Sequence, residues 1–132
     1  MFGKTPPRAG LGSRTLVAFV GTLDAVRAKA FYGDVLGLRL LSEDRFALVF
    51  DANGTKLRVS VVRELRPAGF TVLGWMVPDI QYAVQELAQR SVVFQRFDGM
   101  EQDPQGVWSA PGGAKVAWFL DPDGNTLSLT QI

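Results

Sequence analysis

The stretch DAVRAKAFYGDVLGLRL, residues 24–40, predicts an amphipathic helix that leads into a strand. Asp24 is a typical N-cap, because its carboxylate accepts hydrogen bonds from the unpaired amides of a first helical turn. The residue after the helix, Gly37, suits the left-handed conformation in which many helices end. One helix face is apolar, since side chains recur at the i, i+3, i+4, i+7 spacing at Ala28, Phe31, Tyr32 and Val35.

Strand-forming residues lie on both sides of this helix. β-Branched and aromatic side chains predict a strand at 15–21 before it, and strands at 38–41, 46–51 and 56–62 after it. The Asn53-Gly54 pair between the last two strands is a strong signal for a hairpin turn. The first half of the chain is therefore predicted to be a β–α–β–β–β unit.

The second half of the chain repeats this order. Strands are predicted at 72–77, 92–95, 116–120 and 126–131, with a helix after the N-cap Asp79 and the turn DPDGN at 121–125. Asp79 follows Asp24 by 55 residues, and Asp123-Gly124 follows Asn53-Gly54 by 70. By these offsets Val72 repeats Val17, and Ser128 repeats Arg58.

The repeat predicts an α+β fold of two tandem βαβββ modules that form a curled mixed sheet around a cleft. We expect a flexible N-terminal tail at 1–14 and a single domain at 15–132. Within that domain, module one spans about 15–66 and module two about 70–132. In such a module the helix covers one face of the sheet, so the other face needs a partner.

Composition excludes several functional classes. The 132 residues contain no Cys and no His, which excludes disulfides, thiol nucleophiles and imidazole ligands. Fourteen basic and 13 acidic residues give a net charge of +1, without the electrostatic footprint of a nucleic-acid binder. We find neither a signal peptide nor a membrane-spanning apolar run, and we expect a cytoplasmic protein.

Two segments, DAVRAKAFYGDVLGLRL at 24–40 and AWFLDPDGNTLSLTQ at 117–131, resemble the vicinal oxygen chelate superfamily. That superfamily includes glyoxalase I, extradiol dioxygenases and bleomycin-resistance proteins. The likeness spans about residues 15–131. It implies the fold predicted above and a homodimer, and says little about activity because the superfamily hosts unrelated chemistries.

In metal-dependent members, the resemblance implies ligands on the first strand of each module and on the strand after each hairpin turn. These positions are Val17, Arg58, Val72 and Ser128, the same four that the internal repeat pairs. Two are aliphatic, one is a cation and one is a neutral hydroxyl, so they cannot form the usual carboxylate or imidazole ligand set. We therefore predict no metal and no cofactor.

A calcium loop is the alternative for the DPDGN turn. Asp121, Asp123 and Asn125 have the right spacing, but the glycine comes one residue early and Ile132 stands where a bidentate Glu is needed. We favour a structural turn in which Gly124 adopts a positive φ.

The predicted cleft is apolar and aromatic, with a few hydroxyls and one guanidinium. Alternate residues of a strand share a face, and Trp118 lies across the hairpin from Ser128 if the turn is symmetric. Such a cleft suits a flat or amphipathic small molecule that carries an anionic or carbonyl group. The candidate ligand-binding residues are Val17, Phe19, Arg58, Ser60, Val72, Met76, Trp108, Trp118 and Ser128.

Some of these residues have other interpretations. Arg58 could end on a solvated sheet edge, and Phe19, Met76 and Trp118 could be ordinary core. Trp108, in a loop, could be a lid residue or a dimer contact. The acids of that loop, which could supply a general base, are Asp98, Glu101 and Asp103.

Three hypotheses for function follow. The preferred one is a metal-independent protein of the glyoxalase/bleomycin-resistance type that binds a small molecule without chemistry. The second is a metal-free lyase or isomerase-like enzyme with Arg58 as oxyanion stabiliser and a loop carboxylate as base. The third is an interaction or structural homodimer whose cleft is filled by its own side chains. The sequence assigns no catalytic residue and does not identify the ligand.

Overall fold

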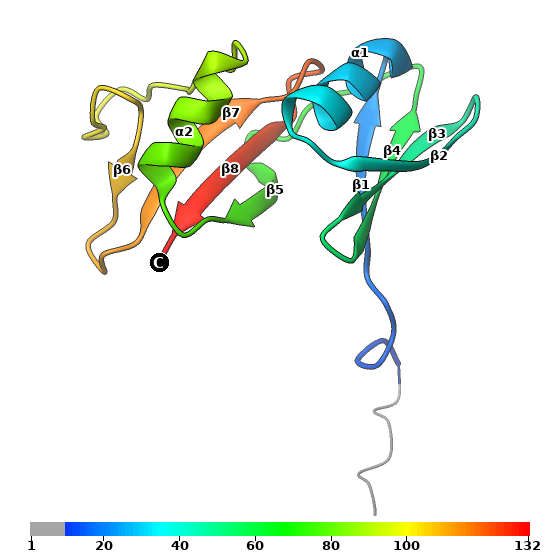
Figure 1. The fold of residues 1–132 in the computed structure, drawn as a ribbon, viewed down its shortest axis with the longest axis horizontal. Helices are drawn as coiled ribbons and strands as arrows, with labels where there is room; N and C mark the ends of the chain where they lie inside the picture. Colours follow the sequence, from blue (N-terminus) through cyan, green and yellow to red (C-terminus); the bar gives the residue numbers. More distant parts are fainter. Residues whose placement is uncertain (1–9) are drawn as a thin grey trace, which may run out of the picture.

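The computed structural model describes residues 10–132, so most of the expected N-terminal tail lies outside the described residues. It confirms the α+β fold of two βαβββ modules (Figure 1). Each module has a four-stranded sheet, in the order β1-β4-β3-β2 and β5-β8-β7-β6. In both sheets the first strand of the module runs parallel to the last, and the remaining pairs are antiparallel.

Module one contains four strands and one helical segment. Strand β1 (Val17–Thr22) is followed by α1 (Ala25–Lys29), which continues as the π-helical turn η1 (Ala30–Val35). Three strands then complete the sheet, namely β2 (Arg39–Glu43), β3 (Ala47–Ala52) and β4 (Thr55–Val61). Asp24 caps the helix as predicted, since its Oδ1 accepts from the N–H groups of Val26 and Arg27.

Module two repeats this arrangement with one difference. It contains β5 (Thr71–Met76), α2 (Ile80–Gln89), β6 (Trp108–Ser109), β7 (Lys115–Leu120) and β8 (Thr126–Gln131). Asp79 caps α2 by accepting from the N–H of Tyr82. The prediction of a strand at 92–95 is wrong, because this segment forms only an isolated bridge between Phe94 and Phe119. The edge strand comes later, after the long loop, as β6.

The registers of the two sheets follow the internal repeat. Phe19 lies opposite Arg58 in the first sheet, and Gly74 lies opposite Ser128 in the second. Trp118 lies across the β7–β8 hairpin from Ser128, as the symmetric turn predicts. The offsets read from the sequence therefore pair residues that occupy equivalent places in the two sheets.

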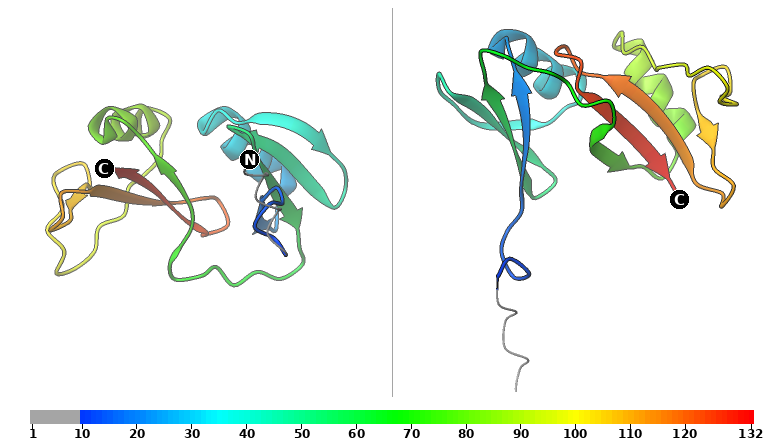
Figure 2. Two further views of the ribbon diagram at one scale, coloured as in Figure 1. Left: turned by 90° about the horizontal axis from the view of Figure 1, so that it is seen from below. Right: turned by 180° about the vertical axis from the view of Figure 1, so that it is seen from behind.

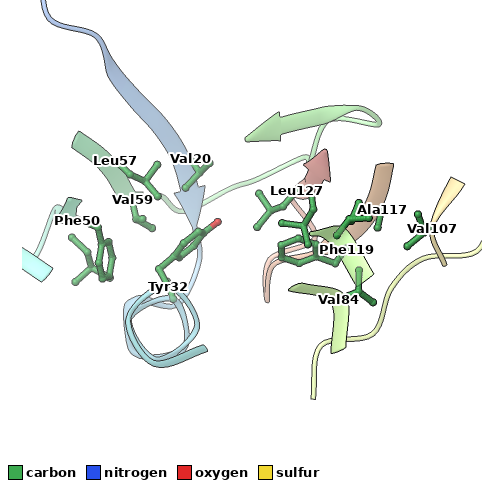
Figure 3. Packing of buried hydrophobic residues seen from close by; sticks show 14 residues of the cluster. Val20, Tyr32, Phe50, Leu57, Val59, Val84, Val107, Ala117, Phe119 and Leu127 are labelled. Atoms are coloured by element: carbon green, nitrogen blue, oxygen red, sulfur yellow. The ribbon is translucent and has the colours of Figure 1, made fainter. Parts of the chain in front are cut away.

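One apolar core joins the modules and lies on the helix-covered side of both sheets. Buried side chains from β1, β3 and β4 surround Tyr32, and those from β7 and β8 surround Phe119, so Figure 3 shows two neighbouring groups. Phe31 connects them, with its ring centroid 5.1 Å from that of Tyr32 and 6.4 Å from that of Phe119.

The sheets remain separate and do not close around a cleft within the chain. Figure 2 shows them as two layers connected by the segment 62–70, with α2 over one face of the second sheet. Side chains alternate in direction along a strand, so those that do not enter the core form a second, uncovered face on each sheet. We call these the first and second open faces. No helix in residues 10–132 is long and apolar enough to cross a membrane.

Candidate functional site

The first open face carries four of the candidate residues. Burial alternates along β1, where Val20 is 7% exposed whereas Val17 is 38% and Phe19 61% exposed. Ser60 shares this face because it pairs with Gly21 of β1. The structure thus brings Val17, Phe19, Arg58 and Ser60 onto one surface.

Arg58 lies in the middle of this face. Strand β4 is flanked by β1 and β3, and Arg58 is opposite Phe19 on one side and Val49 on the other. The alternative of a sheet-edge arginine is therefore wrong. Within residues 10–132, no hydrogen bond or ion pair engages the half-buried Arg58 side chain. Backbone hydrogen bonds from Phe46 and Ala47 and, more weakly, the charge of Arg58 lower the pKa of Asp44. The guanidinium makes no direct bond to that carboxylate, so it can accept a carboxylate or phosphate ligand.

The second open face carries the other five candidates. Val72 is 36% exposed and Met76 72% exposed, whereas Ser128 is buried at 6%. A Cβ on Gly74 would lie 3.0 Å from the Oγ of Ser128, so the glycine leaves room for the hydroxyl. This face therefore combines apolar side chains with the hydroxyls of alternate β8 residues, namely Thr126, Ser128 and Thr130.

Three aromatic rings form a continuous platform on the second open face. The ring centroids of Trp108 and Trp118 are 6.1 Å apart, and that of Phe97 is 5.5 Å from Trp118 in an edge-on arrangement. Trp108 belongs to β6, where it is half-buried and paired with Val116, so it is part of the sheet. Phe97 was missed by the sequence analysis. It lies in the long loop, and its contact with Trp118 depends on how that loop returns to the sheet.

The loop acids do not form a general base near these faces. Asp98 and Glu101 are exposed. Burial alone would raise the pKa of Asp103, but hydrogen bonds from Gln81 and from the amides of Val107 and Gln105 hold that pKa below its ordinary value. A carboxylate that is already ionised and bonded in this way is a poor proton acceptor at neutral pH.

The DPDGN turn connects the two modules. The Oδ1 of Asp121 accepts from the amides of Asp123 and Asn125, and its Oδ2 accepts from the hydroxyl of Tyr32 and the side-chain amide of Asn125. Asp123 accepts from the Thr22 hydroxyl at 2.6 Å and from the Leu23 amide at 2.8 Å. Gly124 has the expected φ of +89°. Asp121 and Asp123 therefore have a structural role, because their carboxylates accept hydrogen bonds from within the protein.

Comparisons with known proteins show the fold. No family model and no curated protein matches the sequence. Solved structures do match. A lactoylglutathione lyase from Agrobacterium tumefaciens superposes with a TM-score of 0.69 at 15% identity over 90% of this chain and 93% of its own. A glyoxalase/bleomycin resistance protein/dioxygenase superfamily member from Sphaerobacter thermophilus gives 0.66 at 22% identity over 89% and 98%.

The chain has the glyoxalase/bleomycin resistance protein/dioxygenase fold. A protein of that description from Alicyclobacillus acidocaldarius also superposes, with a TM-score of 0.64 at 18% identity over 90% of this chain and 91% of its own. Identities this low show the fold and leave activity open.

The residues at the positions of the metal centre that this fold implies are known from the repeat. Val17 and Arg58 are on the first open face, and Val72 and Ser128 on the second, at the repeat-related positions. They offer no carboxylate or imidazole, and a guanidinium repels a cation. No group of three or more acids in the described part of the chain is arranged to hold a metal ion. These side chains do not fit the centre.

Proposed function

We propose that this protein binds a small molecule without a metal ion and without chemical turnover. The ligand is amphipathic or aromatic and carries an anionic or carbonyl group. The main support is Arg58, which lies in the middle of the first open face between Phe19 and Val49 and has no ion-pair partner among residues 10–132. The aromatic platform of Phe97, Trp108 and Trp118 offers a surface on which a flat ring can stack.

The proposal includes a homodimer. Each open face exposes large apolar side chains, among them Phe19 at 61% and Met76 at 72%. Contiguous exposed apolar surface on a folded domain marks an interaction site. A second copy that covers these faces would bring the Arg58 face of one protomer together with the aromatic platform of its partner.

The enzymatic alternative has less support. An oxyanion stabiliser requires an acid or base nearby, and the candidate base Asp103 is engaged by three donors. One structural neighbour is named a lactoylglutathione lyase, but its fold is shared by proteins of several activities. A non-catalytic binder needs only the surface described above.

The test is a ligand screen by thermal shift with and without EDTA. We expect aromatic carboxylates such as 2-naphthoate to raise Tm equally in both conditions, and the neutral 2-naphthamide to act more weakly. Replacing the charge in Arg58→Met should weaken 2-naphthoate binding about tenfold or more, the range for a charge-assisted contact.

The matched control is Arg63→Met, which removes an exposed arginine from the segment between the modules. It should leave binding unchanged. Binding that EDTA abolishes, or an equal loss in both variants, would overturn the proposal. Turnover of the bound compound would favour the enzymatic alternative.

A further inference from the structure

A groove runs between the two modules and is lined by residues of both. Its larger part is a cavity of about 430 Å³. Module one contributes Ala18, Leu57 and the β3–β4 turn, and module two contributes residues 73–76 of β5. A second cavity of about 290 Å³ shares Trp75 and Met76 and reaches the buried side chains of Phe119 and Leu129.

The larger cavity has no charged lining. Its side-chain polar groups belong to Asn53 and Thr55, and the other lining residues are apolar or glycine. An ion placed there would lose hydration without a compensating charge. The cavity therefore selects uncharged molecules, in contrast to the first open face, which carries the guanidinium of Arg58.

The floor of the groove is an unpaired strand edge. Strand β5 has β8 on one side and, within residues 10–132, no strand on the other. The Val77 N–H donates to the Thr130 carbonyl, so the backbone N–H and C=O of Val77 point toward β8. In a strand, the N–H and C=O of successive residues point to opposite sides. The N–H and C=O of Gly74 and Met76 therefore point to the free edge, and both residues line the cavity.

We propose that this inter-module groove is a second ligand site, for a flat, uncharged aromatic molecule that carries a lactam or similar amide. The N–H and C=O of a lactam match the adjacent donor and acceptor of the free strand edge, as a paired strand would. The ring lies against Trp75 and the apolar wall of Ala18 and Leu57. The groove shares Met76 with the candidate residues of the open faces but includes neither Arg58 nor the aromatic platform, so it does not depend on the function proposed above.

The probe is 2-quinolinone, which has an N–H next to a C=O on a flat bicycle. Titration of the wild-type, 15N-labelled protein should shift the amide signals of Gly74 and Met76 and the indole signal of Trp75. N-Methyl-2-quinolinone keeps the shape and lacks the donor. It should bind about fivefold or more weakly, the value of one net hydrogen bond.

Two variants fill the cavity from opposite walls. Ala18→Leu and Ala52→Leu each add apolar volume at a partly buried position, so each folded variant should lose the shifts. If one variant fails to fold, the other still tests the site. The control Ala30→Leu changes an exposed helix position outside the groove and should keep them.

The signals also separate the two proposals. Shifts confined to the indoles of Trp108 and Trp118 would place the probe on the aromatic platform and overturn the groove site. The absence of any shift up to the solubility limit, or equal binding of the N-methyl compound, would overturn it as well. Loss of 2-naphthoate binding in Arg58→Met with intact 2-quinolinone binding would support both sites independently.

Discussion

The hydroxyl of Tyr32 in module one donates to the carboxylate of Asp121 in module two across 2.6 Å, although 89 residues separate them in the chain. Both groups are buried, Tyr32 at 1% and Asp121 at 5% exposure. With the bonds of Asp123 to Thr22 and Leu23, this contact ties the DPDGN turn to the end of β1. The turn therefore connects module two to module one through buried and partly buried hydrogen bonds.

Tyr32→Phe should destabilise the fold without changing it. The variant keeps the ring in the core and removes a hydrogen bond to a carboxylate, which costs about 1.5–3 kcal/mol. Urea denaturation followed by circular dichroism measures the loss. Tyr82→Phe is the control, because Tyr82 is 62% exposed, and it should stay within about 0.5 kcal/mol of wild type. Equal losses in the two variants would contradict the role of the bond.

The same contact predicts a pH dependence. Burial, followed by the charge and hydrogen bond of Asp121, raises the pKa of Tyr32 above its ordinary value of 10.0. The folded state then holds a proton that the unfolded state releases. The stabilisation is complete below about pH 10 and is lost as the pH rises above it. Unfolding free energy should fall between about pH 9 and 11 in wild type and less steeply in Tyr32→Phe; parallel profiles would refute this.

Gly124→Ala should weaken the junction between the modules. Gly124 has a φ of +89°, and an added Cβ would lie 3.2 Å from Cγ of Pro67. The left-handed conformation alone costs a non-glycine residue about 1–2 kcal/mol. Thermal denaturation should show a lower Tm. Gly69→Ala adds a methyl group to open space without a positive φ, and its Tm should change by less than that of Gly124→Ala.

Phe19 and Phe119 should respond differently to truncation. Phe119→Ala removes a fully buried ring and should cost about 3–5 kcal/mol. Phe19→Ser changes a ring that is 61% exposed on the first open face, so monomer stability should change little.

In a homodimer, Phe19→Ser should also affect the contact between the two copies. Phe19→Ser should weaken self-association in sedimentation experiments, because it removes apolar surface from the face that a second copy would cover. Unchanged association in Phe19→Ser would argue that the first open face is not the interface.

The elements were largely predictable because their signals are local. An N-cap such as Asp24 or Asp79 acts within three residues, and the Asn53-Gly54 turn fixes its own hairpin. The strand expected at 92–95 failed for the opposite reason. Its residues have strand propensity, but they form only one bridge to β7, at Phe119, whereas β6 pairs with β7 at Val116 and Lys115.

The candidate site was predictable only in part. Strand alternation placed Phe19 with Arg58, and Trp118 with Ser128, on the expected faces. Phe97 could not be assigned, since its contact with Trp118 depends on the path of a long loop. The partners of Asp103 also depend on that path, and they turned a candidate base into a structural carboxylate.

The sequence by itself determined the two modules, their registers and the lack of a metal ligand set, because periodicity, turn chemistry and residue identity are properties of neighbouring positions. Only the tertiary structure decided that the sheets stay separate, that Arg58 is central and unpaired within residues 10–132, and that a cavity without a charged lining lies between the modules. Those features depend on contacts such as Tyr32 with Asp121, which form between residues far apart in the chain and leave no local signal.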